Sequence, residues 1–174
     1  MMGRNQLMAI AVLGVWIGIT LFMWFAAGRS FATVEQVLLS QNPQYLKITK
    51  SLSTTETRQL LRNLASEINR TFFTAYGWAQ VILGIALLFL LLRQTPRDPT
   101  ALAITGAMLA IVLILTLVVT PQIVTLGRSI DFVPRNPPPP QMARFGLLHG
   151  AYTGLDGLKL LASLGLLIRW MMRG

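Results

Sequence analysis

Residues 72–124 read FFTAYGWAQVILGIALLFLLLRQTPRDPTALAITGAMLAIVLILTLVVTPQIV. The stretch contains two uncharged apolar runs, 72–92 and 101–124, and a helix needs ~20 such residues to cross the hydrocarbon core of a bilayer. Between the runs, Pro96 and Pro99 forbid one continuous helix. Backbone polar groups in lipid have no water to bind, so each run must be a helix. The stretch therefore predicts an antiparallel hairpin of two membrane-spanning helices.

Two further apolar runs lie outside this hairpin. Residues 7–27 carry no charge, and residues 147–172 carry only Asp156, Lys159 and Arg169. We therefore expect an all-α fold, a polytopic four-helix membrane bundle that forms a single domain over residues 1–174. Pro121 is expected to kink or end the third span. Residues 7–27 resemble a signal peptide, but the run is longer than the ~7–15 residues of an h-region.

Residues 28–71 are expected to form a helical segment outside the bilayer. The first helix should continue to about Ser40, and Asn42-Pro43 should stop it. Ser53 and Glu56 have the spacing of a capping box, which predicts the start of a second helix. An apolar stripe follows on that helix: Leu60, Leu61, Leu64 and Ile68. Either the first two helices protrude from the bilayer and pack on each other, or the segment lies in the interface as an amphipathic helix.

The composition is typical of a membrane protein rather than of a soluble enzyme. The 174 residues are 53% hydrophobic and 12% charged, whereas an average soluble domain has roughly 25% charged residues. One His, six acidic residues and no Cys leave few groups for acid–base or thiol chemistry, so we expect no enzymatic activity. The net charge of +9 is carried by residues that flank apolar runs. This placement favours lipid headgroups as the partner and predicts no nucleic-acid binding.

Glycines at small-residue spacing predict close helix packing. Gly14 and Gly18 form a GxxxG pair in the first span, and Gly146, Gly150 and Gly154 repeat the spacing in the fourth. Small residues allow membrane helices to approach closely. The packing is expected within the chain; the alternative is a face for a second copy or for another subunit.

Asp156 and Lys159 are candidates for an intramembrane polar site. They lie three residues apart in the fourth span, so they can pair on one helix face. Asp156 lies about 14 Å from the start of the span at the helical rise, near the bilayer midplane. A carboxylate there costs ~2.5–3.5 kcal/mol on insertion scales and often marks a function. Two interpretations stay open: a proton, ion or ligand site, or a neutralised pair that keeps helices in register.

His149 is the single histidine of the chain. It precedes Asp156 by seven residues, which places both on one helix face, and it lies nearer the membrane surface. Imidazole can ligate haem iron or a metal. A six-coordinate haem would need a methionine as its second ligand, and carboxylates are too few for a metal site. No cofactor is predicted, haem stays an alternative, and a His149 bonded to a carbonyl or to Asp156 is the other interpretation.

Residues 144–150, RFGLLHG, followed by Asp156, resemble the last helix of the domain-of-unknown-function 4149 family. That family is related to eukaryotic transmembrane protein 205. Residues 22–28, FMWFAAG, and residues 120–122, TPQ, with Arg128 after them, are similar to the family too. The resemblance covers most of the chain through short, apolar motifs.

The resemblance implies a four-helix membrane bundle of unknown biochemical activity. In the family, a Phe, a His and a polar residue open the last helix, and Phe145, His149 and Asp156 occupy these places. The polar residue is more often Asn in relatives, so Asp156 departs from the pattern, as does the proline run 137–140. The departure favours a charge-specific role for Asp156. A distant similarity to copper-resistance protein D and to haem-associated bundles keeps a haem or copper interpretation open.

The sequence leads to three functional hypotheses. The first is a structural or accessory subunit of a membrane complex or homo-oligomer, with the lipid bilayer and other membrane subunits or itself as partners. The second is a haem- or metal-binding redox-linked protein that uses His149. The third is proton-linked or small-solute transport around Asp156. The expected location is a bacterial cytoplasmic membrane. The orientation stays open, because the side with fewer basic residues carries them closer to the span ends.

Overall fold

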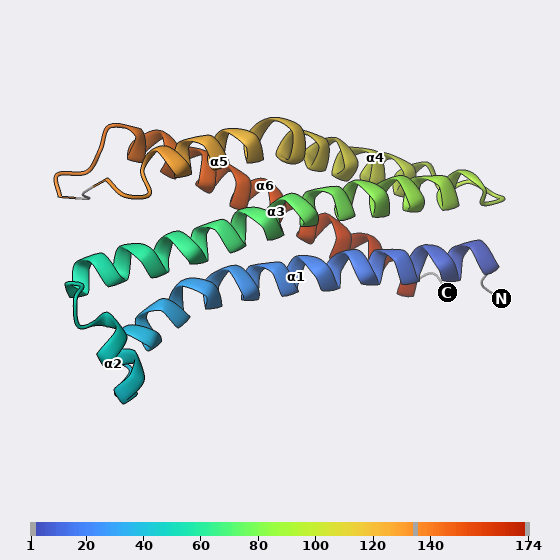
Figure 1. The fold of residues 1–174 in the computed structure, drawn as a ribbon. Helices are drawn as coiled ribbons and strands as arrows, with labels where there is room; N and C mark the ends of the chain where they lie inside the picture. Colours follow the sequence, from blue (N-terminus) through green and yellow to red (C-terminus); the bar gives the residue numbers. More distant parts are fainter. Residues whose placement is uncertain (1–2, 134–135, 173–174) are drawn as a thin grey trace.

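The computed structural model describes residues 3–133 and 136–172, and every regular element in this part of the chain is a helix (Figure 1). The elements are α1 (Arg4–Leu38), α2 (Pro43–Thr49), α3 (Thr54–Leu92), α4 (Pro99–Ile114), the π-helical segment η1 (Leu115–Val119), α5 (Thr120–Ser129) and α6 (Gln141–Met171). Four helical stretches are long and apolar enough to cross a membrane: α1, α3, the continuous path from α4 to α5, and α6. The predicted four-helix bundle is confirmed.

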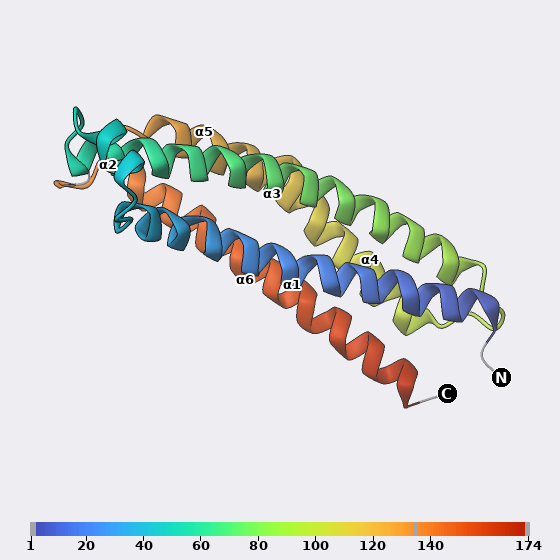
Figure 2. The same cartoon turned by 60° about the horizontal axis from the view of Figure 1, so that its bottom comes forward.

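The bundle is built on the contact between α1 and α3, the most extensive of any helix pair. α4 packs against α3, and α6 lies alongside α1 (Figure 2). The larger apolar core joins all four long helices through fully buried side chains such as Trp16, Leu87, Met108 and Leu166. Both termini and the α3–α4 link lie at one end of the bundle (Figure 1), as four spans require.

The predicted helix boundaries are confirmed where the sequence carries capping residues. The Ser53 N–H donates to Glu56 Oε2 at 2.7 Å, and the Glu56 N–H donates to Ser53 Oγ at 3.2 Å. This capping box starts α3, and α1 ends at Leu38, two residues before Ser40. In the link, Asp98 accepts the N–H groups that open α4. These side chains satisfy backbone donors that a helix cannot satisfy itself.

The segment outside the spans differs from the prediction in two respects. A short helix that was not predicted, α2, follows α1. The side chain of Asn42 caps its first turn. The apolar stripe does not pack on α1 either: Leu60, Leu64 and Ile68 are 51%, 57% and 41% exposed. α3 faces α1 with the smaller residues Ala65 and Asn69 instead, because small side chains allow the two helices to approach.

The first two long helices are longer than a bilayer crossing requires. At the helical rise, α1 is about 52 Å long and α3 about 58 Å, whereas the hydrocarbon core is ~30 Å thick. Outside their apolar runs the two helices are joined by a hydrogen bond from Ser30 Oγ to Asn69 Oδ1 at 3.0 Å and by an ion pair of Arg58 with Glu35 at 3.2 Å. That these parts lie outside the bilayer stays a prediction.

Pro121 does not end the third span. The chain passes from α4 through the π-helical turn η1 into α5, and Pro121 lies in the first turn of α5. A proline ring inside a regular helix clashes with the carbonyl four residues before it. The wider π-helical turn directly upstream gives the ring room, so the helical path continues to Ser129.

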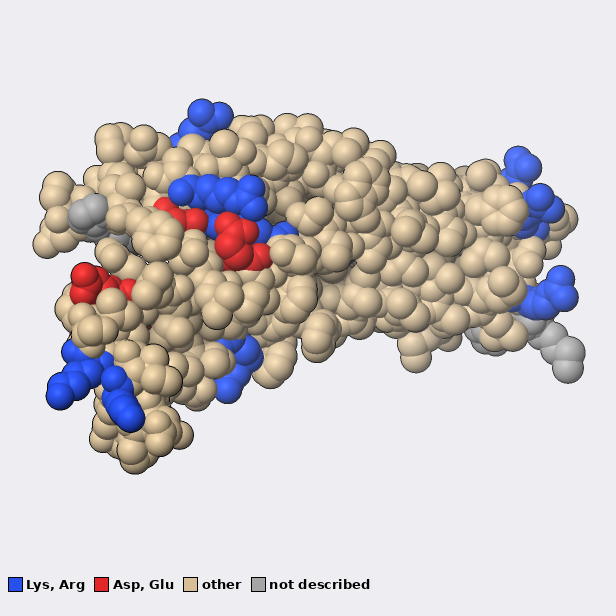
Figure 3. Space-filling view, in the orientation of Figure 1, with Lys and Arg blue, Asp and Glu red and all other residues tan. Residues whose placement is uncertain are grey.

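Charged side chains gather toward the two ends of the bundle, and a wide band between them carries none on the face shown in Figure 3. The charged residues nearest to this band are Arg4, Arg93, Asp98 and Arg169 at one end, and Arg29, Arg70, Arg128 and Arg144 at the other. Along α1, α3 and α6 the two sets are about 35–38 Å apart at the helical rise. This spacing fits a bilayer with a hydrocarbon core of ~30 Å and a total thickness of ~40–45 Å. Between the two sets, the sequence holds only two charged residues, Asp156 and Lys159.

Candidate functional site

The charged pair of α6 is buried in the middle of the bundle. Lys159 Nζ lies 2.6 Å from Asp156 Oδ1, and both side chains are 0% exposed. The contact that the three-residue spacing predicted is therefore confirmed. Both side chains project from α6 toward α1 and α3, since all of their partners on other helices belong to those two elements.

Side chains from α1 and α3 complete the hydrogen bonding of this pair. Besides Asp156, Lys159 Nζ lies 3.1 Å from Thr20 Oγ1 and 3.0 Å from Tyr76 OH, and it also contacts Gln80 Oε1. The three N–H groups of the ammonium are shared among these four acceptors. Tyr76 OH lies 3.1 Å from Asp156 Oδ2, so the phenol accepts from the lysine and donates to the carboxylate. A buried ion pair is stable only if its other polar groups are satisfied, and this arrangement supports a role in helix register.

Two tryptophans of α1 extend the network in different directions. The Trp16 indole N–H donates to Gln80 Oε1 at 3.1 Å, and the Trp16 side chain is fully buried. The Trp24 indole N–H donates to Asp156 Oδ2 at 2.8 Å, yet Trp24 is 41% exposed. Trp24 therefore connects the buried pair to the surface of the bundle.

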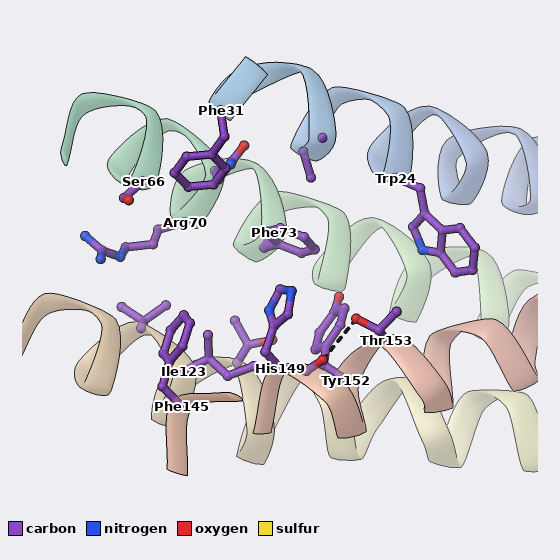
Figure 4. Close-up of a pocket in the computed structure, with 15 residues that line it drawn as sticks. Trp24, Phe31, Ser66, Arg70, Phe73, Ile123, Phe145, His149, Tyr152 and Thr153 are labelled. Carbon is purple, nitrogen blue, oxygen red and sulfur yellow. Dashed lines mark hydrogen bonds between the residues drawn. The ribbon is translucent and has the colours of Figure 1, made fainter. Parts of the chain in front are cut away.

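A cleft opens beside the network, between α1 and α3 on one side and α5 and α6 on the other (Figure 4). We call its deeper part the inner compartment, with a volume of about 420 Å³. Ligand sites typically measure about 300–1,000 Å³. Aromatic and aliphatic side chains predominate among its lining residues: Trp24, Ala27, Gly28, Phe31, Ser66, Asn69, Arg70, Phe73, Thr120, Ile123, Val124, Phe145, His149, Tyr152 and Thr153.

An outer compartment of about 670 Å³ adjoins the inner one. Its wall carries three arginines and one carboxylate: Arg58, Arg62, Arg70 and Asp131. Both compartments share a border of common lining residues: Phe31, Ser66, Arg70, Phe145 and His149. Most of the inner lining lies on the membrane side of the charged residues at this end of the bundle, and most of the outer lining lies beyond them. The cleft therefore reaches from the uncharged band into the charged end of the bundle.

An ion cluster ties α3 to α5 at the border of the two compartments. Arg70 pairs with Asp131 at 2.8 Å and with Glu67 at 2.6 Å, and Arg128 pairs with Glu67 at 3.1 Å. The hydrogen bond from Arg128, followed by that from Arg70, lowers the pKa of Glu67 from 4.5 to about 2. Arg70 thus faces the cleft with its guanidinium already held by two carboxylates.

His149 lies in this cleft and not beside the ion pair. Its ring stacks on Phe145, with centroids 6.0 Å apart and planes at 9°. His149 is exposed, whereas Asp156 is fully buried, so the two side chains do not share a site. The alternative of an imidazole bonded to a carbonyl or to Asp156 is wrong, because within residues 3–133 and 136–172 the ring has no hydrogen bond. Spacing along the helix could not distinguish these cases.

The donor atoms of the cleft do not fit a six-coordinate haem or a metal ion. Neither a methionine nor a second histidine lines the compartment that His149 borders, so a second axial ligand is missing. In the part of the chain that the structure describes, no three His, Cys, Asp or Glu side chains lie close enough to share a metal ion. The haem hypothesis consequently gains no support from the residues around His149.

The predicted glycine packing within the chain is wrong for the GxxxG positions of the first and fourth spans. A Cβ on Gly14, Gly18, Gly146, Gly150 or Gly154 would meet no atom within 4 Å. The close approaches occur at Gly77 and Gly84, where a Cβ would lie 2.8 Å from Thr116 Oγ1 and 2.9 Å from Leu109 Cδ1. The physical reason is the rotation of each helix about its axis. The GxxxG spacing puts the glycines on one helix face, but it does not determine whether that face points toward another helix of the chain. The alternative, a face for another protein, stays a prediction.

The partners of the ion pair were not predicted from the sequence: Thr20, Tyr76, Gln80 and Trp24. A signal for three of them was present, because polar side chains at Thr20, Tyr76 and Gln80 interrupt otherwise apolar spans. Polar residues inside spans usually face the bundle interior. Tyr76 and Gln80 are also four residues apart, which puts them on one helix face.

Comparison of the chain with protein-family models, with curated proteins and with solved structures finds no match. The resemblance to the domain-of-unknown-function 4149 family therefore stays a prediction.

Proposed function

We propose that this integral membrane protein is not an enzyme but binds an amphiphilic molecule, with an apolar chain and a polar head, in the cleft between α1, α3, α5 and α6. The observation that carries the proposal is the position of the cleft. Its inner compartment is lined mostly by residues of the uncharged band, its outer compartment is lined mostly by residues beyond that band, and the two compartments share lining residues. A molecule that fits both must be apolar at one end and polar at the other.

The walls of the cleft match such a ligand. Trp24, Phe73 and Tyr152 surround the inner compartment with large rings, which suit an alkyl or isoprenoid chain. A chain that enters from the bilayer gains little from the hydrophobic effect, because lipid tails are as apolar as the cleft. The affinity must therefore come from packing and from polar groups, such as Ser66 at the border and Asn69 in the inner compartment.

Native mass spectrometry of protein released from its membrane in a mild detergent tests the proposal. We expect a one-to-one adduct with a mass typical of a membrane amphiphile. Ala27→Trp, which places an indole inside the inner compartment, should remove the adduct. Ala107→Trp is the matched control, because Ala107 is exposed on α4 and lies outside the lining of the cleft. An adduct that survives Ala27→Trp, or that Ala107→Trp removes equally, would contradict the proposal.

A structural or accessory role is the second candidate, and the open glycines favour it. Gly14 and Gly18 are exposed on the apolar band with free space above them, as expected of a face that another helix covers. Cross-linking in native membranes should give a discrete larger species that Gly14→Ile with Gly18→Ile abolishes. Gly106→Ile is the control, because a Cβ at Gly106 also meets open space. An unchanged species would exclude this face.

Transport around Asp156 is the least supported hypothesis, because the ion pair is fully buried and hydrogen-bonded. For the location, we propose a bacterial cytoplasmic membrane, since helical bundles are the usual architecture there and outer membranes favour barrels.

A further inference from the structure

We infer that the outer compartment selects an amphiphile with an anionic headgroup, a phosphate or a carboxylate, and that Arg62 binds that group. The inference rests on the proposed function, because it places the apolar chain of the same molecule in the inner compartment. It adds the chemical class of the head and the residue that recognises it.

The two compartments adjoin each other, so the inference places one molecule across both of them. Phe31, Ser66 and Arg70 line the inner and the outer space alike. Arg62 and Ser66 are one helical turn apart on α3, so they lie on the same helix face. A headgroup at Arg62 therefore has a hydroxyl beside it on the membrane side, at the position where its chain would begin.

The charges around the outer compartment leave Arg62 without a counterion. Arg58 pairs with Glu35 at 3.2 Å, and the cluster described above joins the other two arginines of this region to two carboxylates. Four arginines thus face three carboxylates. Within residues 3–133 and 136–172, Arg62 makes no ion pair. Of the three arginines that line the outer compartment, Arg62 is therefore the one whose guanidinium is not already paired with a carboxylate and can take an anion.

The Arg62 guanidinium lies over the ring of Phe31, a residue that lines both compartments. Its central carbon lies 5.7 Å from the centroid of the Phe31 ring. Stacking on an aromatic face restricts the guanidinium while leaving its N–H edge free for a bidentate contact with a carboxylate or phosphate. Because Phe31 also lines the inner compartment, the same ring can contact the first carbons of the chain.

A titration followed by native mass spectrometry tests the inference on the full-length protein. The probes are lysophosphatidic acid and lysophosphatidylcholine with the same myristoyl chain, which differ only in the head, and inorganic phosphate, which has no chain. We expect lysophosphatidic acid to bind at least about tenfold more tightly than lysophosphatidylcholine, as one charge-assisted contact would give. Arg62→Gln should reduce this preference to within about twofold. Arg97→Gln is the matched control, because Arg97 is exposed at the opposite end of the bundle, and it should leave the preference unchanged.

Each of the other outcomes would contradict either the anionic selection or the proposed amphiphile site. If both lysolipids bind equally and Ala27→Trp removes both, the anionic selection fails and the amphiphile site stands. If neither lysolipid binds, the proposed function itself fails. If inorganic phosphate displaces lysophosphatidic acid at equal concentration, the site takes a free anion and the inference of an amphiphile is wrong. A preference that survives Arg62→Gln would assign the anion to another residue.

Discussion

The indole N–H of Trp24 donates to Asp156 Oδ2 at 2.8 Å, while the same ring forms part of the wall of the inner compartment. A single side chain thus lies between the inner compartment and a charged pair in the middle of the bundle. Any molecule in the inner compartment would contact a group that is hydrogen-bonded to the pair. This relationship makes the fluorescence of Trp24 a natural reporter of occupancy.

Trp24→Phe should destabilise the protein, because it leaves one buried lone pair of the Asp156 carboxylate without its donor. We expect a loss of about 1–3 kcal/mol in the free energy of unfolding, measured by titration from a mild to a denaturing detergent. Trp78→Phe is the control, because Trp78 is 52% exposed on the apolar band, and it should change stability by less than about 0.5 kcal/mol. Equal losses in both variants would exclude a role of the hydrogen bond.

Removing one partner of the ion pair should lower the free energy of unfolding more than removing both partners. Lys159→Met leaves the buried Asp156 carboxylate uncompensated, with an expected cost of about 3–5 kcal/mol. The double variant Asp156→Leu with Lys159→Met carries no buried charge and should be more stable than Lys159→Met alone. Unfolding of the two single variants and of the double variant gives the coupling energy. Strictly additive losses would show that the two charges do not stabilise each other.

Alanine should be tolerated at the open glycines and not at the packed ones. At Gly77 an added Cβ would lie 2.8 Å from Thr116 Oγ1, and we expect Gly77→Ala to cost about 1–3 kcal/mol through overpacking. Gly14→Ala meets open space and should be neutral or stabilising by up to about 1 kcal/mol, since alanine favours helix more than glycine. Thermal unfolding of the purified protein distinguishes the two. A destabilising Gly14→Ala would indicate a contact that the isolated chain lacks.

Acid should weaken the contact between α3 and α5 through Glu67. Arg128 and Arg70 lower the pKa of this carboxyl from 4.5 to about 2, so its stabilising effect is complete above pH 4.5. The effect is then lost as the pH falls from about 4.5 to about 2. Thermal midpoints measured across this interval should fall less steeply in Glu67→Gln than in the wild type. Arg128→Gln should act in the same direction, because without Arg128 the pKa of Glu67 lies closer to its unfolded value.

A midpoint that falls equally in the wild type and in Glu67→Gln would assign the acid sensitivity to other carboxylates. The side chain of Glu67 is 41% exposed, so added salt should also reduce the difference between the two proteins.

The sequence by itself determined the four helices, their order and most of their ends. Apolar runs of membrane length need helices because lipid leaves backbone groups unsatisfied. The ends follow from local chemistry, since Ser53 and Asp98 satisfy the first N–H groups of their helices. The pairing of Asp156 with Lys159 is local too, because three residues on one helix bring the side chains together.

Only the tertiary structure decided which way each helix faces. Spacing placed Gly14 with Gly18 and His149 with Asp156 on common helix faces, but it did not reveal whether those positions are covered. Helix rotation depends on the sum of many small contacts between residues far apart in sequence, such as Trp24 with Asp156 and Tyr76 with Lys159. The cleft has the same origin, because its walls come from four helices whose separation no single segment encodes. For this reason the ion pair could be predicted from the sequence, whereas its partners and the cleft beside it could not.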